Sequence, residues 1–249
     1  TVVAAPGETV TVTRPATGEV QVVRAPERPG HSRGRMVFAD GAASDYHLFV
    51  TVPASAVVDG VLNGYRIGPE PPVHSRYPQY YQPPAGFIEV SEAMLDLPVS
   101  PHFTLGQFLC KQASGFPKYL VLDESLPVLL EGLLGEVRAA GYPAATFGII
   151  SGYRTPWYNK QIGNVPNSRH VYGDAMDFYV DVDGDGLMDD LDRDGDRDLE
   201  DVTLLYEMAR DYLARPRNSA LVGGVGRYGQ TSRHGGFVHV DTRGFPARW

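Results

Sequence analysis

Residues 168–180, SRHVYGDAMDFYV, place a histidine and an aspartate seven positions apart, with Gly173 between them. Side chains of a strand alternate between its two faces, so a strand over the second half would direct Asp177 away from its apolar neighbours. Gly173 permits the chain to turn back, which would bring His170 to the same space. The pattern indicates either a metal site or an ordinary hydrogen-bonded surface pair.

The composition is that of a globular protein. The chain has 249 residues, of which 43% are hydrophobic, and can therefore bury a substantial core. It contains no run of eighteen apolar residues, which excludes a membrane-spanning helix, and its start, TVVAAPGETV, does not resemble a signal peptide. The absence of an initiating Met suggests processing or trimming. Cys110 is the single cysteine, so an internal disulfide is excluded.

The acidic charge is concentrated in one segment. Residues 181–201 contain eleven acidic residues against two arginines, a local charge of −9. Because the whole chain carries −8, the remainder carries +1. This balance provides no general basic face, so nucleic acid is not an expected partner.

Three regions follow from the residue patterns. Residues 1–67 alternate in places, as in ETVTVT, GEVQVV and YHLFVTV, and predict a small β-rich region. Residues 68–86 hold six prolines and predict an extended, tyrosine-rich linker. Residues 87–249 form the third region.

The third region predicts an α+β fold, with a small antiparallel sheet and flanking helices. Thr104 is positioned to cap a short helix through FTLGQFLCKQ, and Asp123 to cap a longer helix with a leucine stripe. A further helix is expected at 202–214. Strands are expected at TFGIIS, DAMDFYV, GGVGRY and GFVHVD.

The last of these strands supplies a third candidate ligand. In GFVHVD, alternation places His239 and Asp241 on one face and two valines on the other. Two imidazoles and one carboxylate with an open fourth position form a common catalytic zinc arrangement. Whether the two segments meet in space is not determined by the sequence.

The motifs resemble those of a known family. SRHVYGDAMD matches the SxHxxGxAxD motif of the zinc D-Ala-D-Ala peptidases, peptidase family M15, and HGGFVHVDTRG looks like their C-terminal zinc-ligand strand. SGYRTPWYN is similar to the family's SGYR segment, with Arg154 sixteen residues before His170. The resemblance runs from about residue 100 to Trp249 and is closest to the murein endopeptidase-like branch.

The resemblance implies roles for five residues. His170, Asp177 and His239 would bind Zn²⁺, and Ser168 would lie near the substrate amide. Arg154 would hold the peptide carboxylate or the developing oxyanion, for which its planar fork of donors is suited. Its alternative role is an ion pair with a nearby aspartate.

Two residues, His234 and Asp241, are candidates for the group that carries the proton. Dipeptidase-type members have a glutamate three residues before the last zinc ligand, and this chain has Gly236 there. His234 matches a catalytic histidine of the carboxypeptidase branch and is the preferred candidate, because its titration range suits both accepting and returning a proton. Asp241 is the other candidate, with orienting a ligand or pairing with Arg243 as its alternative roles.

The acidic insertion, residues 181–201, contains DxDxDG twice. Such oxygen-rich spacing favours Ca²⁺, although the two motifs overlap too closely to form independent EF-hands; a solvated acidic loop is the alternative. The candidate calcium ligands are Asp181, Asp183, Asp185, Asp190, Asp192, Asp194 and Asp201.

The expected function is therefore a zinc peptidase, a D,D-carboxypeptidase or murein endopeptidase, acting on peptidoglycan stem peptides. Because peptidoglycan lies outside the cytoplasm, the resemblance implies an exported protein of the periplasm or cell envelope. A non-catalytic, metal-stabilised binding module of the same fold is the alternative. A calcium-dependent scaffold such as a dockerin is a weaker one, because the acidic motifs overlap.

Overall fold

The protein is described by a computed structural model covering residues 1–13, 17–232 and 234–249. The α-helices are α1 (Ser125–Ala139), α2 (Pro156–Gln161) and α3 (Leu199–Ala214). The strands are β1 (Val2–Ala4), β2 (Thr9–Thr13), β3 (Val20–Arg24), β4 (Gly30–Val37), β5 (Ala43–Val50), β6 (Val52–Pro53), β7 (Val61–Leu62), β8 (Tyr65–Arg66), β9 (Gly86–Val90), β10 (Pro98–Ser100), β11 (Phe103–Thr104), β12 (Lys118–Leu120), β13 (Gly148–Ser151), β14 (Ala175–Tyr179), β15 (Gly224–Tyr228), β16 (Phe237–Asp241) and β17 (Ala247–Arg248). The 3₁₀ helices are η1 (Ala54–Ala56), η2 (Pro78–Tyr80), η3 (Glu92–Met94), η4 (Leu105–Phe108), η5 (Arg169–Tyr172) and η6 (Pro216–Leu221).

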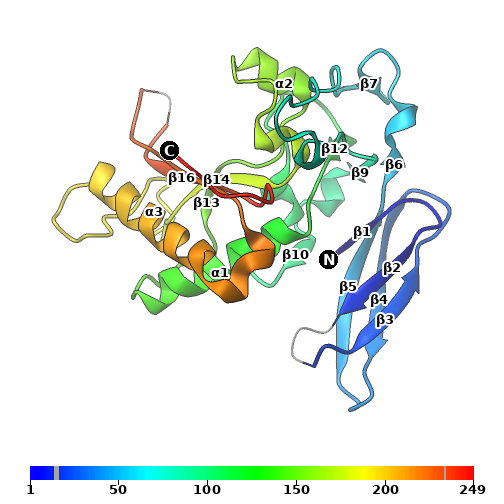
Figure 1. Cartoon of the computed structure of the whole chain (residues 1–249), viewed down its shortest axis with the longest axis horizontal. Coiled ribbons are helices and arrows are strands. Elements are labelled where there is room, and N and C mark those ends of the chain that lie inside the picture. Colours follow the sequence, from blue (N-terminus) through cyan, green and yellow to red (C-terminus); the bar gives the residue numbers. More distant parts are fainter. Residues whose placement is uncertain (14–16, 233) are drawn as a thin grey trace.

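The N-terminal strands form a lobe at one side of the molecule (Figure 1). A three-stranded sheet has the order β1-β5-β4, and β2 pairs with β3 as an antiparallel hairpin. Alternating side chains of these strands enclose a small separate apolar cluster that includes Leu48 and Val50. The predicted β-rich character of this region is confirmed.

A five-stranded sheet organises the remainder of the chain, in the order β13-β14-β16-β15-β17. All of its neighbours are antiparallel except β15 and β17. Helix α3 packs against β15 and β16, and α1 packs against α3, so these two helices lie beside the sheet (Figure 1). The mixture of helices with small sheets confirms the predicted α+β class and is compatible with an M15-like domain.

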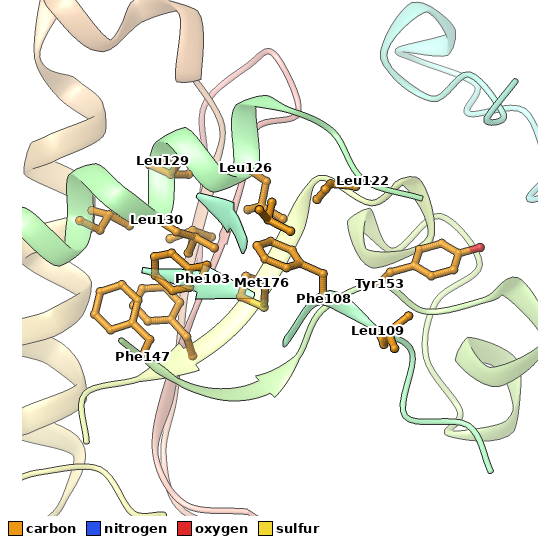
Figure 2. Packing of buried hydrophobic residues seen from close by; sticks show 14 of the residues in the cluster. Phe103, Phe108, Leu109, Leu122, Leu126, Leu129, Leu130, Phe147, Tyr153 and Met176 are labelled. Carbon is orange, nitrogen blue, oxygen red and sulfur yellow. The ribbon is translucent and has the colours of Figure 1, made fainter. Parts of the chain in front are cut away.

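The main core lies between α1 and the sheet (Figure 2). The leucine stripe of α1 is fully buried, and from the sheet Met176 and Phe178 point into the same cluster. The N-cap of α1 is Glu124, which makes no side-chain cap, so the cap predicted at Asp123 is one residue early; Asp123 still accepts a hydrogen bond from the Ser125 amide at 2.8 Å. Burial of the apolar face of β14 leaves Asp177 on the opposite face.

Two helices begin or end at residues other than those predicted. The helix through residues 103–112 is shorter than predicted: Thr104 does cap it in a box with Gln107, but only η4 forms. Its end is fixed by the backbone, because the Phe108 carbonyl accepts a hydrogen bond from the Tyr153 amide at 2.9 Å. Helix α3 begins three residues before the predicted Val202, at a capping box formed by Asp198 and Asp201.

The residues around the predicted linker pack closely against the core. Phe49, Leu62 and Ile67 belong to the main apolar cluster, and β6 pairs with β9 across the linker. Within residues 68–86, Tyr81 is buried. The domain division at residues 67 and 86 stays a prediction.

No helix in the described part of the chain combines the length and apolarity needed to cross a bilayer.

Candidate metal centre

Three side chains from separate elements converge on one face of the five-stranded sheet, over its inner strands β14 and β16. His170 Nε2 lies 3.1 Å from Asp177 Oδ1 and 3.2 Å from His239 Nδ1. His239 Nδ1 lies 2.8 Å from the same Asp177 oxygen. All three residues are buried, and one ligand atom of each lies within 4.8 Å of the others; their assignment as zinc ligands stays a prediction.

The backbone explains this convergence. Asp177 and His239 are directly opposite partners in the β14–β16 pairing, so both side chains leave the same face of the sheet. His170 reaches them from η5, which ends at Gly173 with φ +76°. A Cβ at Gly173 would lie 2.3 Å from the Val121 carbonyl oxygen, so the turn requires glycine for both its dihedral angle and the space.

The spacing of the ligand atoms fits a zinc ion. Ligands held ~2.0–2.1 Å from a tetrahedral centre lie ~3.3 Å from one another. The three observed separations lie slightly below that value. Nitrogen and carboxylate donors are also the types that zinc prefers. The three residues could therefore hold zinc with a fourth position left for water or substrate.

Each ligand has a second contact that fixes its orientation. His170 Nδ1 lies 2.7 Å from the Gly152 carbonyl, and His239 Nε2 lies 3.0 Å from Asp241 Oδ2. The other Asp177 oxygen accepts a hydrogen bond from Arg154 Nη2 at 2.6 Å. Such contacts set the tautomer and direction of metal-binding imidazoles.

Asp241 is fully buried and serves several donors at once. Besides His239, it accepts hydrogen bonds from Arg243 Nη2 at 2.5 Å, Arg243 Nε at 2.8 Å and the Gly224 amide at 2.9 Å. A carboxylate held in this way is suited to orienting His239.

Burial and the two carboxylates affect the two imidazoles differently. Burial lowers the pKa of His170, which favours the neutral ring that a metal requires. Burial acts in the same direction on His239, but hydrogen bonds from its ring to Asp177 and Asp241 outweigh burial and raise its pKa to about 9. Burial disfavours the charge of Asp177, yet His170 and His239 beside it hold its pKa well below the usual range. A cation entering the site must therefore displace a proton from His239.

A comparison with protein families identifies the part of the chain that carries two of these ligands. The Peptidase M15 family model matches residues 101–190. This match supports membership of peptidase family M15. Searches of curated proteins and of solved structures gave no match. M15 peptidases generally depend on zinc, and the matched range contains His170 and Asp177. His239 lies beyond it and is joined to the M15 segment by the sheet pairing.

A cleft of ≈ 520 Å³ opens beside the three candidate ligands. Arg154 and Ser168, both singled out from the sequence, line it. Arg154 is also paired with Asp177, so the ion pair named as its alternative role is present as well. Tyr228 and Trp249 also line the cleft and are joined by a hydrogen bond of 2.6 Å from the indole Nε1.

His234 is placed less directly. Its ring packs edge-on against Phe237, with 5.0 Å between ring centroids, and its Nδ1 lies 2.8 Å from the Gly235 carbonyl. Phe237 lines the cleft, whereas His234 is not among the described residues that do. Its role as proton carrier stays a prediction.

The acidic insertion forms two similar loops. Asp181 accepts hydrogen bonds from the amides of residues 184–186, and Asp190 does the same nine residues later with residues 193–195. Two groups of converging carboxylates result, Asp181, Asp183 and Asp189, and Asp190, Asp192 and Asp194. Of these, Asp189 was not singled out from the sequence.

Two of the predicted calcium ligands lie outside these groups. Asp185 pairs with Arg197 at 2.6 Å. Asp201 is buried, and its two oxygens accept hydrogen bonds from the amides of Leu191 at 2.6 Å and Asp198 at 2.7 Å. Asp201 therefore supports the start of α3. Calcium binding stays a prediction.

Sequence analysis missed one pair beside the metal ligands. Arg169 and Asp174 are both buried and form an ion pair across the turn that carries His170. The available signal was a pair of opposite charges at the two ends of a glycine-containing turn.

Proposed function

We propose that this protein is a zinc peptidase that hydrolyses D-amino-acid-containing peptide bonds of bacterial peptidoglycan. The observation that carries the proposal is the buried group of His170, Asp177 and His239 beside an open cleft. Peptidase family M15 membership of residues 101–190 supports the peptidase class, and the motif resemblance supports the substrate.

The residues of the chain divide the chemical tasks. A bound zinc ion would act as a Lewis acid toward the scissile carbonyl and lower the pKa of water at the site. His170, Asp177 and His239 would hold that ion. Arg154, fixed by Ser151 at 2.8 Å and by Asp177, presents its guanidinium to the cleft, where it would orient a substrate carboxylate or carbonyl.

Peptide hydrolysis also needs a group that accepts a proton from water and delivers it to the leaving amine. We assign this task to His234, because the contacts of Asp241 favour orientation of His239. The His234 ring packs on Phe237, which lines the cleft, and this proximity supports the assignment.

The substrate implies a location. Peptidoglycan lies outside the cytoplasm, so we propose that the protein works in the periplasm or cell envelope. For the acidic insertion we propose Ca²⁺ as a second cation, on the basis of the DxDxDG spacing.

Digestion of defined muropeptides tests the proposed function. The zinc-loaded protein is incubated with a stem peptide ending in D-Ala-D-Ala and with a cross-linked dimer, and the products are separated by chromatography. An all-L peptide and the His239→Ala variant are the controls. We expect cleavage of a D-amino-acid substrate that a chelator abolishes. If zinc is bound but no substrate is cleaved, the non-catalytic binding module is favoured instead.

A further inference from the structure

Arg169, the residue immediately before the metal ligand His170, is clamped on several sides. It is 7% exposed, and its guanidinium carbon lies 4.6 Å from the ring centroids of both Tyr81 and Tyr172. Its Nη1 donates a hydrogen bond of 2.6 Å to the Tyr80 carbonyl. Two of these contacts, those with Tyr80 and Tyr81, come from the proline-rich linker. We call this arrangement the Arg169 clamp.

The carboxylate partner of the clamp lies at the other end of the same turn. Arg169 Nε lies 3.1 Å from each oxygen of Asp174, which is 3% exposed. Asp174 immediately precedes β14, the strand that carries Asp177, and its carbonyl accepts the Thr242 amide at 3.0 Å. The ion pair therefore ties the turn bearing His170 to the strand bearing Asp177.

The linker also contacts the support of the third ligand. Tyr77 and Tyr80 pack on Phe245, with centroid distances of 4.5 and 5.3 Å. The guanidinium of Arg243, which pairs with Asp241 behind His239, lies 5.6 Å from the same Phe245 ring. Linker tyrosines thus contact Arg169 directly and reach the support of His239 indirectly, through Phe245 and Arg243.

We propose that Arg169 is a positioning residue of the metal centre, and that the linker segment 77–81 completes the centre by fixing that arginine. A planar guanidinium that lies against two mutually perpendicular tyrosine rings and pairs with both oxygens of a carboxylate has one preferred orientation. Because Arg169 directly precedes His170, a fixed arginine also fixes the position of the His170 backbone, from which the imidazole extends. This inference rests on the proposed zinc site but not on the proposed substrate.

Zinc affinity, measured by competition with a chromogenic chelator, tests the proposal on the full chain. Arg169→Lys keeps the charge but loses the planar fork and the stacking. We expect it to weaken zinc binding by ~10–100-fold, the usual scale when a residue that orients a metal ligand is changed. Tyr81→Leu, which removes one aromatic face, should weaken binding in the same direction and serves as a second variant if Arg169→Lys does not fold.

Arg215→Lys is the matched control. Arg215 makes the same kinds of contact, a two-point pair with Glu136 at 2.5 and 2.6 Å and a tyrosine face at 5.4 Å, but it does not line the metal cleft. We expect this variant to bind zinc normally, with any change confined to the melting temperature.

Two results would overturn the proposal. One is unchanged zinc affinity in both Arg169→Lys and Tyr81→Leu while the melting temperature of the metal-free protein falls, because the clamp would then serve folding alone. The other is an equal loss of zinc affinity in Arg215→Lys. A wild-type protein that binds zinc but cleaves no muropeptide would refute the proposed function and leave this inference standing.

Discussion

Replacing Asp241 by asparagine separates the two roles that the sequence left open for this residue. The carboxylate Oδ1 accepts three N–H groups, from the Gly224 amide and from the backbone and Nε of Arg243. Oδ2 accepts two, from His239 Nε2 and Arg243 Nη2. An asparagine carbonyl is expected to take the Oδ1 side, where it serves more donors, which places the amide NH₂ against His239.

The expected losses of zinc affinity and of stability follow from that arrangement. His239 would lose the acceptor that fixes its ring, and such changes reduce metal affinity by ~10–100-fold, or ~1.4–2.7 kcal/mol. The half-buried side chain of Arg243 would also lose one charged partner, which destabilises the fold by about 1–3 kcal/mol. Asp241→Asn should therefore show weaker zinc binding together with a lower melting temperature.

The assay is competition for zinc with a chelator at fixed pH, followed by turnover at saturating zinc. Glu136→Gln is the matched control, because it also breaks a two-point pair with an arginine, Arg215, away from the ligands. The control should lower the melting temperature and leave zinc affinity unchanged. If Asp241→Asn binds zinc within about twofold of the wild type and yet has no turnover, the orienting role is wrong and Asp241 is the proton carrier.

Four other changes probe the metal sites and the catalytic histidine. His170→Ala and His239→Ala should each abolish tight zinc binding, because a three-ligand site cannot lose an imidazole, and metal analysis of the purified variants would contradict this if zinc remained. The raised pKa of His239, about 9 against an ordinary 6.5, means that its charged form stabilises the metal-free protein below pH 6.5 and that this stabilisation is lost as pH rises through about 9. Since zinc must displace that proton, affinity should fall by about tenfold per pH unit from pH 8 to 6.5, and a flat profile in the competition assay would count against it. Calcium should raise the melting temperature of zinc-loaded protein, and Asp183→Asn with Asp194→Asn should remove the increase; insensitivity of the wild type to millimolar calcium would indicate a solvated acidic segment. His234→Ala should keep zinc but lower muropeptide turnover by ~10²-fold or more, and near-normal turnover would remove it as proton carrier.

The strands that carry the ligands were predictable because their side chains alternate strictly. In DAMDFYV and GFVHVD the apolar positions had to face the core, so Asp177 and His239 had to face away from it. Gly173 marked the turn that returns His170 to the same face. The sequence could not show that the two strands are neighbours, because pairing between segments sixty residues apart depends on the packing of the whole sheet.

The linker shows where sequence patterns mislead. Its prolines indicated an extended connector, and they do prevent a regular α-helix there. Its tyrosines, however, are packed on Arg169 and Phe245, which are distant in the sequence. Composition reports which backbone conformations are open to a segment, but not which surface it covers.

The β15–β16 hairpin carries a metal ligand in strand β16, and its connecting segment lies outside the strand pairing that positions this ligand. Asp177 and His239 face one another across β14 and β16, so inserting one residue within β16 would turn the histidine toward the apolar side and destroy the centre. The connection between Tyr228 and Phe237 lies outside that pairing, and both rings line the cleft, stacked 4.7 Å apart. A change in the length of this connection would leave the ligand register intact. The same connection carries His234, so the change would also move the proposed proton carrier, and zinc binding and proton transfer can be altered separately at this hairpin.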